Sequence, residues 1–290
     1  MSSVFDPAVL VLNREVNTDY LRFLKERDGA ADRRAGTLAR REAYFAAIDA
    51  HPVPYEGPPL EADFRAALGA GASSSSPALA LWMAIAASAN EGEKYSVERI
   101  LASRPPQADP EDPMTYIELE ELYHTRLLLD AIKTLGVDYA VKAPPLWVRF
   151  LASTMIFAPK SIEYMVVFFS EVVGTVLFAA LARKARELVD PATATGGRIV
   201  SLIEEILVDE VGHVAFARAQ LGPVRLWIAK QTVRALAGAM YRATPAIRAL
   251  FDTEALAEAA INLDLSTLPA HIRARAFMVE APVATGLAPA

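Results

Sequence analysis

The chain has 290 residues, of which 53% are hydrophobic and 22% charged, and it contains no cysteine. This length allows one large domain with a generous core. The missing cysteines exclude disulfides, thiolate metal sites and cysteine nucleophiles. A net charge of -6 and a pI near 5.4 offer no basic stripe, so we expect no nucleic-acid partner.

The N-terminal residues 1–12 carry neither a basic region nor the sustained apolar run of a signal peptide, so we expect a cytoplasmic location. The most apolar run, residues 165–182, is interrupted by Glu171 and preceded by Glu163. It therefore predicts a buried helix of a bundle rather than a membrane span.

The N-terminal flank, from Phe5 to Ala50, predicts two helices with a break near Gly29. Charged residues fall on the expected outer faces of these helices, which predicts a solvated surface there. These residues are Arg33, Arg34, Arg40, Arg41 and Glu42. A proline-rich linker over 52–59, a short helix over 60–68 and a Gly/Ser loop over 69–76 follow.

The first long helix should begin at Ser76-Pro77, a capping residue followed by proline, and run to about Ser103. Glu93 lies on the same face as Leu79, Trp82, Ala86, Ala89, Val97 and Ile100, where an apolar residue would be expected. Glu91 lies on a solvated face. The periodicity therefore favours Glu93 over Glu91 as an inward carboxylate.

The second long helix should begin at Asp112-Pro113 and end at Leu135-Gly136. Its apolar stripe contains Glu121 and His124, three residues apart and therefore on one face. Neither residue belongs on an apolar stripe unless something there offsets the desolvation of a carboxylate, and a metal cation is a strong candidate.

Two further long helices each carry an inward carboxylate. Glu171 lies on the stripe of a helix over 160–189, and Glu210 lies with His213 on a helix over 199–217. A loop over 191–197 should precede the latter helix, and Gly222-Pro223 should end it. The remaining apolar segments predict a packed crossover helix over 146–158 and accessory helices over 224–241, 245–251 and 268–277, before a loose tail over 282–290.

Four successive helices thus present one Glu, then Glu-x-x-His, then one Glu, then Glu-x-x-His. This is a ligand set that places two metal ions in the core of a four-helix bundle. Four carboxylates and two neutral imidazoles balance the charge of two divalent cations, and imidazole suits iron. The sequence therefore predicts an all-α bundle with a two-metal centre.

These residues resemble the ferritin-like di-iron oxygenase superfamily, which includes the p-aminobenzoate N-oxygenase type, acyl desaturases and bacterial multicomponent hydroxylases. The resemblance implies a ferritin-like four-helix bundle over 77–221, flanked by helices over 1–76 and 222–290, in one helical domain over 1–290. It also implies a role for each of the six ligands. The bridging carboxylates would be Glu121 and Glu210, the terminal ones Glu93 and Glu171, and the imidazole ligands His124 and His213, one for each iron.

The resemblance also implies roles for three neighbouring residues. Glu120 and Asp209 would each hold the far ring nitrogen of the histidine on the partner helix. Thr175, one turn after Glu171, resembles a hydroxyl that several oxygen-activating members place beside the cluster, although it could instead bond back to the carbonyl of Glu171. The N-oxygenase type has an extra histidine where this chain has Ile206, so the resemblance does not single out N-oxygenation.

The expected function is a non-haem di-iron oxidoreductase that activates dioxygen to oxidise a small organic substrate by N-oxygenation, hydroxylation or desaturation. It would need two iron ions, with manganese as the alternative metal, and an electron donor, and a homodimer is a further expectation. Two alternatives are a ferroxidase or iron-storage protein and a metal-free interaction module. The long flanking segments favour the oxidoreductase, because storage subunits are little more than the bundle.

Overall fold

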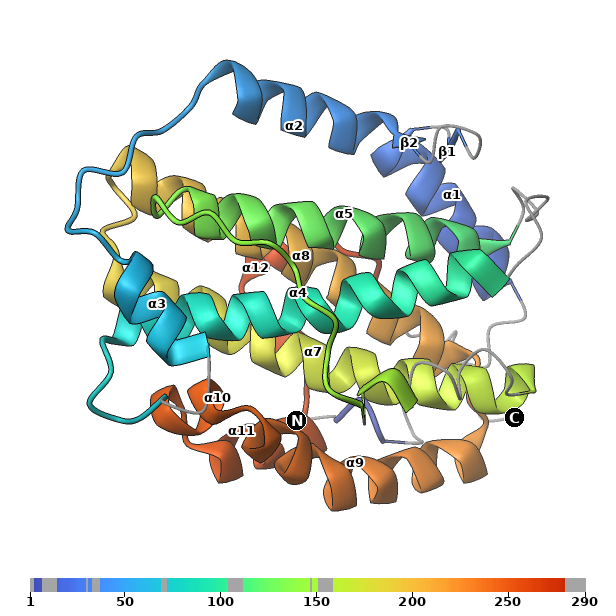
Figure 1. The fold of residues 1–290 in the computed structure, drawn as a ribbon. Helices are drawn as coiled ribbons and strands as arrows, with labels where there is room; N and C mark the ends of the chain where they lie inside the picture. The colour runs from blue at the N-terminus through green and yellow to red at the C-terminus, as the bar shows by residue number, and fades with distance from the viewer. Residues whose placement is uncertain are drawn as a thin grey trace, which may run out of the picture.

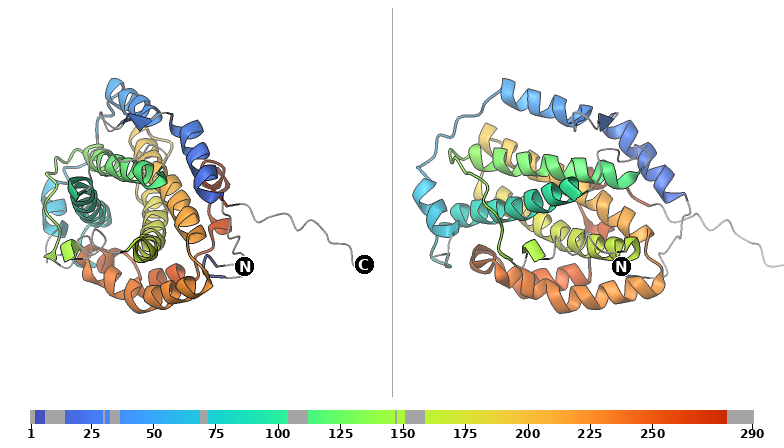
Figure 2. Two further views of the ribbon diagram at one scale, coloured as in Figure 1. Left: turned by 90° about the vertical axis from the view of Figure 1, so that its right-hand side faces the viewer. Right: turned by 45° about the vertical axis from the view of Figure 1, so that its right-hand side comes forward.

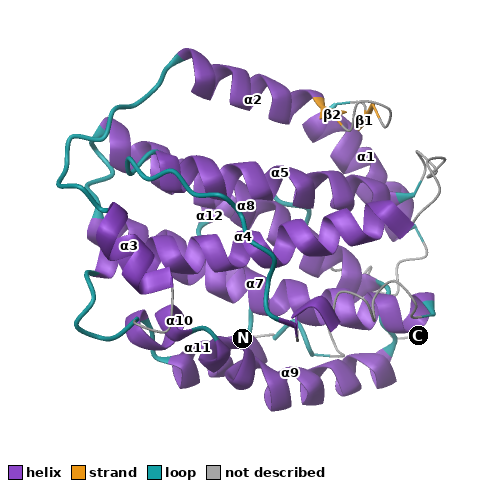
Figure 3. Ribbon diagram, viewed as in Figure 1, coloured by secondary structure: helices purple, strands orange, loops and turns teal. Residues whose placement is uncertain are grey.

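The structure is a computed structural model whose described residues are mostly helical (Figure 3), so the predicted all-α class is confirmed. It describes residues 3–6, 15–29, 31–32, 37–68, 72–103, 112–146, 148–150 and 159–279. The two short strands β1 (Ala31–Asp32) and β2 (Thr37–Leu38) pair antiparallel beside the N-terminal helices.

Four long helices form the centre of the molecule: α4 (Ala78–Ser103), α5 (Pro113–Lys133), α7 (Lys160–Leu188) and α8 (Ala194–Ala219). They run side by side in Figure 1 and surround a common axis in the end-on view of Figure 2. Helix α4 packs on α5, α5 on α8, α8 on α7 and α7 on α4. Because this ring is closed, the inward stripes of all four helices face one shared core.

The N-terminal helices α1 (Val16–Asp28) and α2 (Ala39–Ala50) lie outside this ring. Helix α1 packs against both α5 and α8. The predicted break is present, because α1 ends at Gly29, whose φ of 81° lies in the left-handed region that glycine adopts without strain. The chain can therefore turn sharply between the two flanking helices.

The helices within residues 223–261 cover the side of the ring opposite α2 (Figure 1). Helices α9 (Pro223–Ala243) and α11 (Thr253–Ile261) pack on α7, and α3 (Glu61–Leu68) packs on α4. Three shorter elements complete the fold: α10 (Pro245–Leu250), η2 (Leu265–Thr267) and α12 (Ala270–Arg273).

Local capping explains where the bundle helices begin. The Asp112 side chain accepts a hydrogen bond of 3.1 Å from the amide of Met114, and Pro113 occupies the first turn of α5, as predicted. Thr193 likewise accepts from the amide of Gly196 at 3.0 Å. Helix α8 therefore begins at Ala194, and the prediction of a loop as far as residue 197 was wrong.

Two other predictions need correction. Leu146 and Phe150 are 78% and 69% exposed, so the described part of the predicted crossover helix is only partly packed, while residues 147 and 151–158 lie outside the described residues. The segment 268–277 contains only the short α12. Helix α11 was not predicted, although Asp252 caps it by accepting from two backbone amides.

Within the described residues, one helical stretch, Ile162–Leu188, is long and apolar enough to cross a membrane by length and composition. Its mean hydropathy is 2.2 and 61% of the window is buried inside the protein. The buried part packs on α8 and α9, so the apolar character of this helix serves the core of the bundle.

Candidate metal centre

The six predicted ligands come together in the core of the bundle. Helix α4 contributes Glu93 and α7 contributes Glu171, while α5 and α8 contribute a glutamate and a histidine each, namely Glu121, His124, Glu210 and His213. Their side chains converge because every one of these helices faces the shared core.

The six residues form two overlapping groups. Glu93 and His124 belong to one group, Glu171 and His213 to the other, and Glu121 and Glu210 belong to both. In each group the four potential ligand atoms lie within 4.8 Å of one another. Three carboxylates and one imidazole therefore surround each of two adjacent positions, and the two shared carboxylates lie where they could bridge two metal ions.

Both histidines are fully buried, and each is held at its far ring nitrogen by a carboxylate. Nε2 of His124 lies 3.2 Å from Asp209 Oδ2, and Nε2 of His213 lies 3.0 Å from Glu120 Oε2. Each acid comes from the neighbouring helix, Asp209 from α8 and Glu120 from α5. Such a contact fixes the ring orientation and favours the tautomer in which the other nitrogen is free to bind a metal.

The inward nitrogen of each ring faces the ligand carboxylates. Nδ1 of His124 is 3.6 Å from an oxygen of Glu121 and 3.6 Å from one of Glu210. Nδ1 of His213 is 3.1 Å from Glu121 and 3.3 Å from Glu171. Both imidazoles therefore present a nitrogen to the space that the carboxylates surround.

Two buried polar atoms at this centre make no hydrogen bond with the described part of the chain: Glu93 Oε2 and His124 Nδ1. A buried polar atom without a partner costs free energy, so both atoms call for a partner that the described residues do not supply. Oxygen and nitrogen atoms in this arrangement fit divalent iron or manganese.

The structure distinguishes Glu93 from Glu91. Glu93 belongs to one of the two ligand groups, whereas Glu91 accepts a hydrogen bond from the hydroxyl of Tyr139. The structure therefore brings Glu93, the glutamate that the periodicity of α4 favoured, to the other candidate ligands.

Thr175 is fully buried one helical turn after Glu171. Its hydroxyl has no hydrogen-bond partner among the described residues, so it does not bond back to the carbonyl of Glu171. A buried hydroxyl in this state is available to a bound molecule.

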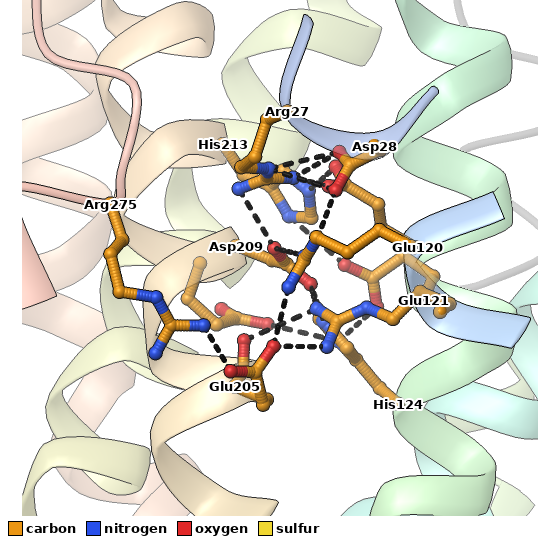
Figure 4. A network of polar contacts seen from close by, with 12 residues as sticks. Arg27, Asp28, Glu120, Glu121, His124, Glu205, Asp209, His213 and Arg275 are labelled. Carbon is orange, nitrogen blue, oxygen red and sulfur yellow. Dashed lines mark hydrogen bonds and ion pairs between the residues drawn. The ribbon is translucent and has the colours of Figure 1, made fainter. Parts of the chain in front are cut away.

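A layer of arginines surrounds the two acids that hold the histidines (Figure 4). Arg27 pairs with Glu120, Asp28 and Asp209, and Arg41 pairs with Asp209 and Glu205. Arg40 reaches Asp28, Glu205 and Asp209, and Arg275 reaches Glu205.

The prediction that Arg40 and Arg41 are solvated was wrong, because the side chains are 23% and 0% exposed. Arg33 and Arg34 lie outside the described residues.

This arginine layer neutralises its own acids. The four arginine charges equal the four carboxylate charges of Asp28, Glu120, Glu205 and Asp209. Among the described residues, no arginine or lysine pairs with the four inner glutamates Glu93, Glu121, Glu171 and Glu210. Two divalent ions would supply the missing four positive charges.

Without metal, bound protons would supply positive charge to the inner glutamates and histidines. Burial raises the pKa of Glu93 to about 8. Burial alone would lower the pKa of His124, but the neighbouring Glu121 charge raises it to about 10. Burial and the charge of Glu171 also raise the pKa of Glu210. These shifts are those of a carboxylate cluster that needs positive charge.

A glycine on α7 lets one carboxylate approach. A Cβ atom added to Gly174 would lie 2.7 Å from Oε2 of Glu210, closer than side chains tolerate. Neither Gly174 nor the arginine layer was predicted from the sequence. Glu205 lies one turn before Asp209 on α8, and this spacing could have identified it. The arginines of the layer have no comparable spacing that would predict their burial.

Comparison of the chain with protein-family models, curated proteins and solved structures found no match.

Proposed function

We propose that this protein is a ferritin-like, non-haem di-iron oxidoreductase that activates dioxygen to oxidise a small organic substrate. The observation that carries the proposal is the pair of overlapping ligand groups that share Glu121 and Glu210. Two carboxylates shared between two adjacent cation positions match a two-metal carboxylate bundle and differ from an ordinary buried ion pair.

The charge distribution supports the same proposal. The outer acids are already paired with arginines, so the inner glutamates remain for the metal ions. Hard oxygen ligands with one imidazole per ion favour iron, and manganese is the alternative. Iron in such a site would supply the redox chemistry with dioxygen.

The chain's own residues would position the metal ions and the reactants. Glu120 and Asp209 hold the two imidazoles so that Nδ1 points inward. The buried hydroxyl of Thr175 can donate a proton or a hydrogen bond to an oxygen atom bound next to it. The aliphatic core around Ile206, which is fully buried, keeps bulk water away from the centre.

The test is anaerobic loading with ferrous iron, followed by metal analysis and rapid mixing with oxygen. We expect about two irons per chain, because the centre offers two sets of iron ligands. We also expect the protein to consume oxygen and its optical spectrum to change. Glu121→Ala and His213→Ala should each lower bound iron well below two per chain, because each change removes a ligand from the centre.

The same experiment separates the alternatives. Many irons per chain would support an iron-storage protein, and rapid oxidation of ferrous iron with release of ferric ions would support a ferroxidase. Retention of two tightly bound ions by both variants, or no binding by the wild-type chain, would refute the proposed centre.

A further inference from the structure

Arg27 lies in the last turn of α1, outside the four-helix ring, yet its side chain is only 13% exposed. It forms an ion pair with Glu120 on α5, and its Nη1 lies 3.0 Å from Oδ1 of Asp209 on α8. A third acid, Asp28, accepts from Nε of Arg27 at 2.9 Å. One guanidinium group therefore joins acids on three helices.

The two acids on the bundle helices are those that hold the histidines. Glu120 contacts Nε2 of His213, and Asp209 contacts Nε2 of His124. Arg27 is thus one contact away from both imidazoles, as Figure 4 shows. A substitution of Arg27 can therefore affect both halves of the centre, namely the ligand group of His124 and the ligand group of His213.

Arg41 provides a contrast within the same layer. It pairs with Asp209 and with Glu205, and among the described residues it forms no ion pair with Glu120. Its effect on the centre therefore runs through Asp209 and His124 alone. Within the described part of the layer, Arg27 reaches both histidine supports, whereas Arg40 and Arg41 reach only Asp209.

We propose that Arg27 is a positioning residue for both halves of the candidate metal centre, acting through Glu120 and Asp209, whereas Arg41 positions only the His124 half. This inference rests on the proposed two-metal function. It assigns to α1, a helix outside the bundle, the task of orienting ligands that lie on α5 and α8.

The chemistry of the side chain explains why arginine occupies this place. The guanidinium group is planar and carries five donors, so it can bind two carboxylates at once in a fixed geometry. An ammonium group provides one compact charge and cannot span the two acids in the same way. Without the guanidinium group, two buried carboxylates would lose a cation, and the imidazole rings that they hold would lose a fixed orientation.

The test is anaerobic titration with Co²⁺ alone, followed by visible absorption, of the full chain and four variants. Arg27→Gln should weaken both Co²⁺ steps by about tenfold or more, the usual effect of losing the support of a ligating histidine. Arg41→Gln should weaken one step and leave the other within about twofold. Arg27→Lys should restore stability but not the wild-type absorption bands, because it returns the charge without the geometry.

Arg22→Gln is the matched control, because Arg22 lies on the same helix with a side chain that is 62% exposed and pairs with Asp19. It should bind Co²⁺ as the wild type does. Thermal unfolding of the metal-free proteins separates a structural role from positioning, since a purely structural Arg27 would change the melting temperature without changing the Co²⁺ spectra.

Each outcome decides one point. Wild-type binding of two Co²⁺ with unchanged affinities and spectra in Arg27→Gln overturns this inference alone, as does full rescue of both steps and bands by Arg27→Lys. Equal weakening of both steps in Arg41→Gln overturns the distinction between the two arginines. A wild-type chain that binds fewer than two Co²⁺ overturns the proposed function, and this inference with it.

Discussion

Replacing Gly174 by alanine would place a methyl group against a carboxylate of the candidate centre. The added Cβ would lie 2.7 Å from Oε2 of Glu210 and 3.6 Å from its carboxyl carbon. Ordinary contact begins near 3.4 Å, so the oxygen must move by about 0.7 Å, the difference between 3.4 and 2.7 Å. Since Glu210 belongs to both ligand groups, both metal positions should be affected.

The size of the effect follows from the narrow tolerance of metal coordination. Metal–ligand distances in functional sites stay within about 0.2 Å of their usual values, so the required shift is several times too large. We expect metal affinity to fall by about tenfold or more, which corresponds to at least about 1.4 kcal/mol. Helix propensity acts in the opposite direction, because alanine is favoured over glycine inside a helix by about 1 kcal/mol.

The assay is anaerobic titration with ferrous iron, combined with thermal unfolding of the metal-free protein. Gly92→Ala is the matched control, since Gly92 lies inside α4 and, among the described residues, its added Cβ would meet only Val148 Cγ1, at 3.9 Å. Gly174→Ala should lose metal affinity while the metal-free protein melts within about 4 °C of the wild type, and Gly92→Ala should keep both metal ions. Wild-type affinity in Gly174→Ala would refute the placement of Glu210 as a shared ligand.

Four other predictions concern the same centre. Glu93→Ala should impair metal loading while Glu91→Ala leaves it nearly unchanged, and the reverse result in metal analysis would exclude Glu93 as a ligand. Asp209→Asn should cost about tenfold or more in metal affinity, measured by titration, because the support of His124 is weakened. Thr175→Val should keep both metal ions and change the rate of the reaction with oxygen in stopped-flow mixing, and an unchanged rate would exclude a role for the hydroxyl. The raised pKa values of about 8 for Glu93 and about 10 for His124 keep both groups protonated at pH 7 without metal. Metal binding should therefore release protons, and metal affinity should rise with pH. Calorimetry in buffers of different ionisation enthalpy would detect the released protons, and a metal affinity that does not change with pH would contradict the prediction.

The inward direction of the candidate ligands could be predicted because it depends on local geometry. A helix repeats its face every 3.6 residues, so Glu121 with His124, and Glu210 with His213, had to point the same way once their helices formed. The same rule separated Glu93 from Glu91. The cost of desolvation indicated a metal ion, since a carboxylate on an apolar stripe needs a compensating charge.

Capping signals also act locally, and this explains which helix boundaries were correct. Asp112 and Pro113 begin α5 as their chemistry requires. Helix α8 starts earlier than predicted because Thr193 caps it, so Gly196 and Gly197 lie inside the helix. The Asp252 cap carried the same kind of signal for α11, a helix too short to show a clear apolar period.

The sequence alone therefore determined the class of fold and the inward direction of the ligand side chains, because both follow from the spacing of residues along one helix. Only the tertiary structure decided which charges are buried. Arg27 and Arg41 occupy ordinary polar faces of flanking helices, and an arginine on such a face has the same local pattern whether it meets water or an acid from another helix. The close approach of Gly174 to Glu210 likewise depends on the packing of α7 against α8, and no spacing within either helix encodes it.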